Sequence, residues 1–312
     1  MTYFACFGYP GLIGLMFSCA IIALCGAKAL IAVREYDIKD PHTFNKTIGG
    51  KLGGKFLTVC CGLFSYSAYI VVLAGIKQIC GGSIWPVVIA VAFSYFVLCR
   101  GFGTLVDICG VCAPVIAGAI AIIALTGAFL RGETNNVTEV KYAAPSVFMA
   151  LKILLYAGYN VLTAVCVLGR CRELVSTNKT AVGGGIIGGT MLFVSGAAVL
   201  IGMVYSKILP GIYEMPVAEI FADTNMLPEM SFVLKIAIFT AMFLSVISGL
   251  TGTCVFFTDY IKEKNLGIVL ALLAVPATYL SFGTLMDILY PIFGIAGIFL
   301  IIVLALMGNK KV

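Results

Sequence analysis

Nine long apolar segments constrain the fold of this chain more than any other feature of its sequence. They cover about residues 10–33, 56–76, 84–99, 104–130, 144–168, 182–205, 231–257, 267–283 and 285–307. A helix of about 20 apolar residues matches the ~30 Å hydrocarbon core of a bilayer. With 61% hydrophobic and 11% charged residues, the sequence predicts an all-α integral membrane protein. We expect one transmembrane domain, residues 1–312, with nine transmembrane helices in the lipid bilayer.

The basic residues of the connecting segments predict how the chain is oriented. One alternate set of connections holds thirteen of them, against four in the other set. Cytoplasmic loops carry an excess of Lys and Arg. We therefore predict a cytoplasmic C-terminus and, with an odd number of spans, an external N-terminus. The net charge of +6 follows from these loops, so no nucleic-acid partner is expected.

The apolar segment at residues 144–169 carries polar and small residues in its middle, where the sequence from residue 155 reads LYAGYN. The amide of Asn160 has donors and an acceptor that lipid cannot satisfy. Gly158 weakens a helix by about 1 kcal/mol relative to alanine. We predict a discontinuous helix at a midplane binding site, with Tyr156, Gly158, Tyr159 and Asn160 contacting a small-molecule solute. The alternative is an ordinary span whose small residues pack against neighbouring helices.

Lys152 lies one turn before this polar stretch, deep enough in the span to be costly in lipid. The pKa of a buried lysine shifts readily. We therefore include Lys152 in the predicted solute site, where its ammonium group can replace a coupling cation.

The sequence does not favour an enzyme. The twelve cysteines lie mostly in apolar segments, where cysteine behaves as a small hydrophobe. Cys109 and Cys112 have metal-site spacing, but their segment contains no histidine. No zinc-binding His/Glu pair, paired aspartates or Ser–His couple falls within the spans. We expect no enzyme activity, no metal and no cofactor other than a coupling ion.

The apolar segments recur along the chain. The four spans in residues 1–130 are followed, about 172 to 183 residues later, by four similar spans in residues 143–312. The long link after the first span is basic, whereas its counterpart at residues 206–230 is acidic and contains prolines. Opposite orientations of two similar halves indicate an inverted-topology repeat. The counterpart of the 144–168 span would lie upstream of Met1. We predict a 4+5 transporter fold that lacks the first helix of repeat one; the alternative is a native nine-span protein.

Three stretches resemble the YkvI-type family of bacterial membrane proteins, which is related to the amino acid–polyamine–organocation transporters. The resembling stretches are LYxxYN from Leu155, LMDILYPIFGIAG from Leu285 and YFACFGYPGLIG from Tyr3. The resemblance covers essentially the whole chain and implies the five-plus-five inverted-repeat fold, in the inner membrane of a bacterium. The family's glycine-rich first helix, which supplies half of the solute and cation site in this fold, is absent here.

The resemblance also implies which further helices surround the site. The third helix of the fold corresponds to residues 56–76, where Tyr66 could bind a solute carboxylate; membrane tyrosines are more often interfacial anchors. The eighth helix corresponds to residues 231–257, where Ser245, Ser248 and Thr251 offer hard oxygens to a small cation such as Na⁺. The alternative for these hydroxyl groups is bonding to carbonyls one turn earlier in their own helix.

The expected function is secondary transport of a small organic solute, an amino acid in the first instance, by alternating access coupled to Na⁺ or H⁺. The missing helix favours an alternative, a non-transporting membrane sensor or partner subunit. The sequence predicts no oligomeric state.

Overall fold

The computed structural model describes residues 2–131, 142–145, 147–207, 228–256 and 262–307. In this part of the chain helices form nearly all of the structure, and no strand occurs. The helices are α1 (Thr2–Ala5), α2 (Gly11–Glu35), α3 (Pro41–Ile79), α4 (Trp85–Arg100), α5 (Phe102–Arg131), α6 (Val147–Leu168), α7 (Asn178–Tyr205), α9 (Pro228–Val255), α10 (Glu263–Ala277) and α11 (Phe282–Leu306), with a 3₁₀ turn η1 (Arg172–Leu174).

Each predicted apolar segment overlaps one of the helices from α2 onward. Within the described residues, seven helices are long and apolar enough to cross a membrane. Helices α4 and α10, with 16 and 15 residues, are shorter. The all-helical architecture is therefore confirmed, whereas the count of nine membrane crossings stays a prediction.

The link predicted between the first two spans is helical, which corrects the sequence-based assignment of residues 34–55. Helix α3 begins at Pro41, and Asp40 caps it by accepting a hydrogen bond from the Thr43 backbone N–H at 2.7 Å. At Gly50 the backbone leaves the helical conformation, with φ +68°. The chain folds back there, and Gly54 lies against the backbone of Lys46. The kink places a short helix at the end of the molecule before α3 continues as a span.

The predicted span at residues 267–283 is wrong at both ends. Helix α10 begins at Glu263 and ends at Ala277. The Thr278 hydroxyl group donates to the Val275 carbonyl oxygen at 2.7 Å, which satisfies an orphan carbonyl of the last turn. Ser281 then caps α11 by accepting from the Thr284 N–H at 3.2 Å. Short-range capping thus separates two helices that hydropathy alone runs nearly together.

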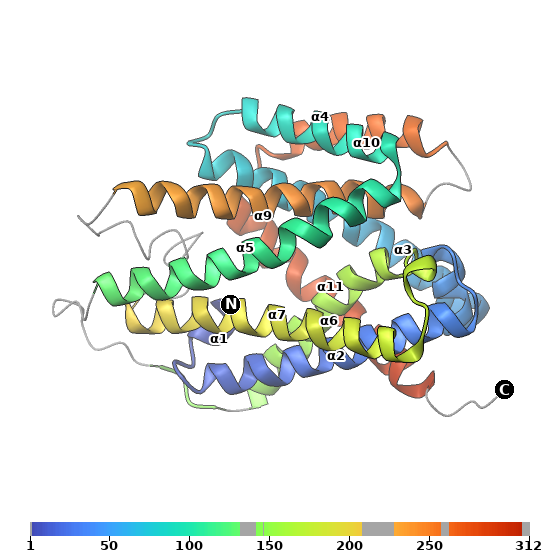
Figure 1. Cartoon of the computed structure of the whole chain (residues 1–312), viewed down its shortest axis with the longest axis horizontal. Helices are drawn as coiled ribbons and strands as arrows, with labels where there is room; N and C mark the ends of the chain where they lie inside the picture. The colour runs from blue at the N-terminus through green and yellow to red at the C-terminus, as the bar shows by residue number, and fades with distance from the viewer. Residues whose placement is uncertain (1, 132–141, 146, 208–227, 257–261, 308–312) are drawn as a thin grey trace.

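The helices form two groups that are seen one above the other in Figure 1. The lower group consists of α2, α6 and α7, with α2 packed along both of the others. The upper group consists of α3, α4, α9 and α10, in which α3 packs along α9 and α4 packs against α9 and α10. Helix α5 contacts α7 and α9, and α11 contacts α6 and α3. These two helices therefore touch both groups.

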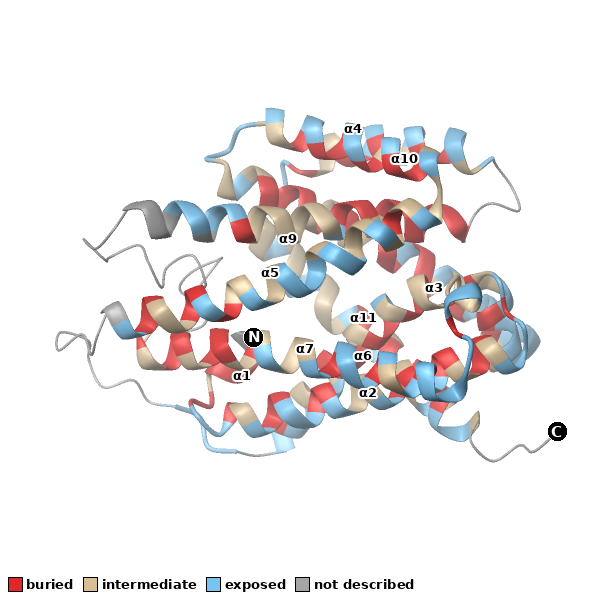
Figure 2. Ribbon diagram, in the orientation of Figure 1, coloured by how far each residue is buried: buried red, intermediate tan, exposed pale blue. Residues whose placement is uncertain are grey.

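A buried cluster joins the two groups (Figure 2). It combines Phe64 of α3 with Leu162 and Cys166 of α6 and Leu300 of α11. The upper group also has a cluster of its own, to which α3, α4, α9 and α10 contribute.

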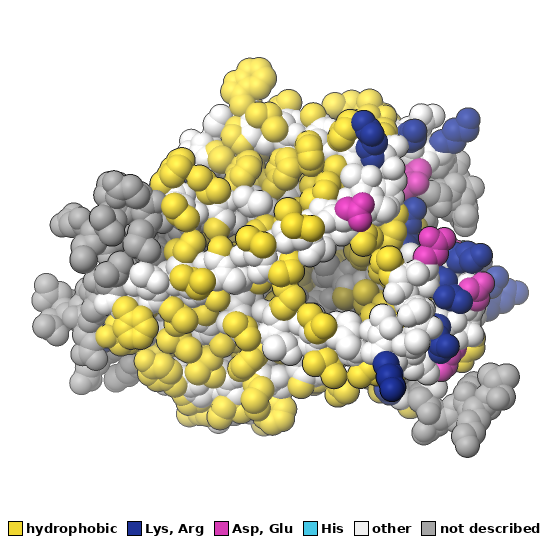
Figure 3. Space-filling model, in the orientation of Figure 1, with side chains coloured by type: hydrophobic (Ala, Val, Ile, Leu, Met, Phe, Trp, Pro, Cys, Tyr) yellow, Lys and Arg dark blue, Asp and Glu magenta, His cyan; other side chains and the backbone are white. Residues whose placement is uncertain are grey.

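Lys and Arg side chains gather at one end of the molecule, whereas hydrophobic side chains cover the middle of the face in Figure 3. We call this end the basic end; α2, α4, α6, α9 and α11 finish there. Arg34 donates to the Asn178 side chain at 2.8 Å, and Lys28 donates to the Ala305 carbonyl oxygen at 3.2 Å, so the ends of α2, α7 and α11 lie together. Arg34 is one of the thirteen basic residues for which the charge distribution predicts the cytoplasmic side.

Candidate functional site

Helix α6 runs without a break from Val147 to Leu168, so the predicted discontinuity at residues 156–160 is wrong. The Asn160 amide donates to the Tyr156 carbonyl oxygen at 2.8 Å, one turn earlier. This bond satisfies a donor of the amide without opening the helix. The backbone at Gly158 packs directly on Gly294 and Gly297 of α11. The alternative, a continuous span whose small residues pack against a neighbour, therefore describes Gly158.

The two tyrosines of α6 lie in different surroundings. Tyr156 is buried, and its ring meets that of Phe4 edge-on at 5.4 Å. The Tyr159 ring stacks on Tyr290 of α11 at 3.9 Å and meets Phe64 of α3 edge-on at 5.0 Å. Tyr156 thus faces the lower group, whereas Tyr159 lies at the junction of α3, α6 and α11.

Tyr66 and Lys152 lie in other parts of the structure. The Tyr66 hydroxyl group donates to the Leu270 carbonyl oxygen of α10 at 3.2 Å, inside the upper group. The Lys152 ammonium nitrogen lies 3.2 Å from the Cys6 sulfur and 4.9 Å from the centre of the Phe148 ring. The predicted solute-site residues are therefore not gathered around one cavity, and their roles stay predictions.

The predicted cation ligands of α9 donate to their own helix. Ser245 donates to Ala241, Ser248 to Leu244 and Thr251 to Ile247, at 3.0 to 3.1 Å. A hydroxyl oxygen that donates in this way keeps lone pairs for a cation. The alternative for these hydroxyl groups, bonding to carbonyls one turn earlier in their own helix, is therefore present. Cation binding stays a prediction. Among the described residues, no three His, Cys, Asp or Glu side chains are placed to hold a metal ion.

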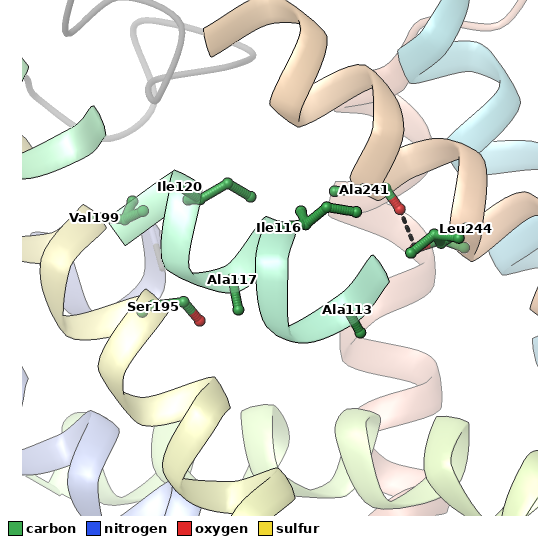
Figure 4. Close-up of a pocket in the computed structure, with 10 residues that line it drawn as sticks. Ala113, Ile116, Ala117, Ile120, Ser195, Val199, Ala241 and Leu244 are labelled. Carbon is green, nitrogen blue, oxygen red and sulfur yellow. Dashed lines mark hydrogen bonds between the residues drawn. The ribbon is translucent and has the colours of Figure 1, made fainter. Parts of the chain in front are cut away.

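A cavity of about 340 Å³ lies between α5, α7 and α9 (Figure 4). Its lining is apolar apart from two hydroxyl groups; the residues are Ala113, Ile116, Ala117, Ile120, Ser195, Gly196, Val199, Ala241, Leu244 and Ser245. A second cavity of about 390 Å³ shares Ala117 and Ser195 with it. We call the two together the α5–α7 groove, and the face in Figure 3 is hollowed between these helices.

The groove is connected through its lining to two of the predicted site residues. Val199 lines the groove and belongs to the same buried cluster as Tyr156. Ser245, predicted as a cation ligand, lines it directly. An apolar cavity with a few hydroxyl groups suits the apolar part of a small amphipathic molecule.

Sequence reasoning missed Ser195 and the small residues of α5. Ala113 and Ala117 are spaced one helical turn apart, which is the local signal that could have identified the lining. Nothing in the sequence indicates that this face meets Ser195 of α7.

Comparisons with known proteins agree with this architecture. No protein-family model matches the chain. The uncharacterized membrane protein YkvI of Bacillus subtilis (strain 168) is 23% identical over 306 residues, which cover 94% of this chain and 85% of YkvI. The predicted resemblance to YkvI is confirmed. The similarity to this membrane protein and the seven apolar helices of the described residues together show that the chain is a multi-pass membrane protein.

A solved structure, MhsT in complex with L-phenylalanine, has a TM-score of 0.70 with this YkvI-like chain. The match covers 99% of the chain and 85% of MhsT, with 15% sequence identity. At this identity the likeness shows the fold. The chain therefore has the helix arrangement of MhsT.

Proposed function

We propose that the protein is a secondary transporter, which moves a small organic solute across the membrane by alternating access. The likeness to MhsT over 99% of the chain carries this proposal, because that fold holds L-phenylalanine in the solved structure. We extend it to an amino acid as solute and to Na⁺ or H⁺ as coupling ion. Residues 1–130 and 143–312 form the two inverted repeats in a bacterial inner membrane, with the basic end and the C-terminus in the cytoplasm.

The α5–α7 groove is our proposed solute pocket. Its first cavity, of about 340 Å³, falls within the ~300–1,000 Å³ range of small-molecule sites. The groove receives the apolar part of the solute, and the Ser195 and Ser245 hydroxyl groups bond its polar part. The oxygens of Ser245, Ser248 and Thr251 form the proposed cation site, one turn apart along α9.

Solute-dependent stabilisation of the purified protein tests the proposal. L-phenylalanine and the other standard amino acids are added singly, with NaCl or with choline chloride, and the thermal unfolding midpoint is measured. A ligand at 100 times its Kd stabilises the folded state by roughly 2.7 kcal/mol. At least one amino acid is expected to raise the midpoint, and dependence on NaCl would identify Na⁺ as the coupling ion.

A pair of variants on α5 locates the pocket. Ala117 lines both cavities, so Ala117→Leu is expected to abolish the shift produced by that amino acid. Val111 is 70% exposed on the same helix, so Val111→Leu should leave the shift unchanged. If the amino acid shifts the unfolding midpoint equally in both variants, the groove is not the solute pocket.

A second pair tests α6. Asn160→Leu is expected to weaken solute binding, whereas Thr163→Val, which alters an exposed residue one turn further on, should not. If no amino acid shifts the midpoint and reconstituted protein takes up none of them, transport is refuted. Recovery of activity with a specific partner protein would then support a non-transporting subunit.

A further inference from the structure

Arg170 connects three helix ends at the basic end of the molecule. It follows α6, and its guanidinium nitrogen lies 3.4 Å from the carboxylate of Glu263, the first residue of α10. The guanidinium carbon also lies 4.9 Å from the centre of the ring of Phe102, the first residue of α5. The Arg170 and Glu263 side chains are 23% and 32% exposed. Partial burial weakens the screening of such a pair by salt.

This ion pair joins the lower group of helices to the upper group. A second pair close by does not: Arg172 binds Asp37, two residues after the end of α2, with nitrogen and oxygen 2.6 Å apart. That contact, like the bond from Arg34 to Asn178, ties the ends of α2 and the α6–α7 connection, which belong to the lower group. Of the ion pairs among the described residues, Arg170–Glu263 is therefore the one that links α6 to α10.

The seam between the two groups is tightly packed on the basic side. There Cys166 of α6 and Cys61 of α3 are buried, and the Cys166 thiol donates to the Cys61 carbonyl oxygen at 3.8 Å. Cys166 also faces Gly252 of α9. Further from the basic end, α3 and α9 turn large side chains such as Tyr69 and Val246 into the core of the upper group itself. The structure is thus closed at the basic end.

We propose that Arg170, Glu263 and Phe102 form a latch that holds the two groups together, and that its release lets the basic end open. The proposal rests on the alternating-access function proposed above, since a transporter of this kind must open each end in turn. Opening separates α6 from α3 and α9 and exposes the seam. The latch residues lie outside the α5–α7 groove and do not line it.

Native cysteines report this opening without further labels. Purified full-length protein is treated with N-ethylmaleimide, and the alkylation rates of individual cysteines are measured by mass spectrometry of peptides. Cys166 lies in the seam. Cys19 of α2 is equally buried but lies within the lower group, with its backbone against Gly189 of α7. Loss of the latch should therefore raise the rate at Cys166 and leave the rate at Cys19 unchanged.

The key variant is Glu263→Gln, which keeps the shape of the side chain and removes its charge. When opening and closing are fast, alkylation follows the population of the open state. Loss of a partly buried pair is expected to raise the Cys166 rate about fivefold. The charge exchange Arg170→Glu with Glu263→Arg should return it toward the native rate. Arg172→Gln, which breaks the pair within the lower group, is the matched control and should leave Cys166 protected.

The latch is refuted if Cys166 is alkylated at the native rate in Glu263→Gln. It is also refuted if the rate at Cys19 rises as much as that at Cys166, which indicates general loosening. The latch is also refuted if Arg172→Gln raises the alkylation rate of Cys166 as much as Glu263→Gln does. The measurement uses no solute. Failure of amino acid binding with the expected alkylation pattern would therefore overturn the transport function and leave the moving seam in place.

Discussion

Alanine at position 158 is expected to destabilise the protein, although alanine is the better helix former. The higher helix propensity of alanine alone would stabilise α6 by about 1 kcal/mol. A Cβ atom on Gly158, however, would lie 2.9 Å from the Ile298 nitrogen and 3.1 Å from the Gly297 carbonyl carbon, and it would overlap the Gly294 carbonyl oxygen. These atoms are all backbone, so α6 and α11 must move apart. Overpacking of this kind costs about 1–3 kcal/mol, which leaves a net loss of up to about 2 kcal/mol.

The thermal unfolding midpoint in one detergent measures this balance. Gly183→Ala is the matched control, because a Cβ atom there meets nothing within 4 Å and only the propensity gain applies. We expect Gly158→Ala to unfold a few degrees below the native protein and Gly183→Ala to unfold at or above it. If both variants are equally stabilised, the close contact of α6 with α11 does not exist in the protein.

Three further predictions concern other parts of the chain. Lys28→Met removes the ammonium group that bonds the Ala305 and Leu304 carbonyls at the end of α11, so it should cost roughly 0.3–1 kcal/mol and speed hydrogen exchange in the last turn of α11. Burial raises the pKa of the Cys171 thiol to about 11; because the thiolate reacts, alkylation at pH 8 should be roughly a hundredfold slower than that of free cysteine and should rise with pH up to about 11. A pH-independent rate would contradict that burial. Gly50→Ala forces a residue with a side chain to φ +68° and should lower stability by about 1–3 kcal/mol, whereas Gly53→Ala should not.

The helices were predictable because the length and hydrophobicity of each segment can be read from its own residues, without knowledge of what it contacts. The predicted span at residues 144–168 contains one helix, Val147–Leu168, for the same reason that it was recognised, namely its length and apolar character. The ends were less predictable, since they depend on single capping residues such as Asp40 and Ser281. The helix at residues 41–49 was missed because its sequence is polar on average and lacks the hydropathy of a span.

The site was less predictable because its residues meet across long separations. Gly158 indicated a break, but the α11 glycines it packs against lie more than a hundred residues later. Arg170 and Glu263 are 93 residues apart, so no local pattern pairs them. Asn160 was recognised as a polar residue in an apolar span, yet the bond to Tyr156 that satisfies it is compatible with either a broken or a continuous helix.

Uptake by reconstituted protein tests the central claim most directly. Purified protein in liposomes is supplied with radiolabelled L-phenylalanine and the other standard amino acids under an inward Na⁺ gradient or an inward proton gradient, beside protein-free liposomes. The account predicts that at least one amino acid accumulates under one gradient and that Ala117→Leu abolishes the accumulation while Val111→Leu does not. Uptake no greater than in protein-free liposomes, for every amino acid and under both gradients, would contradict it.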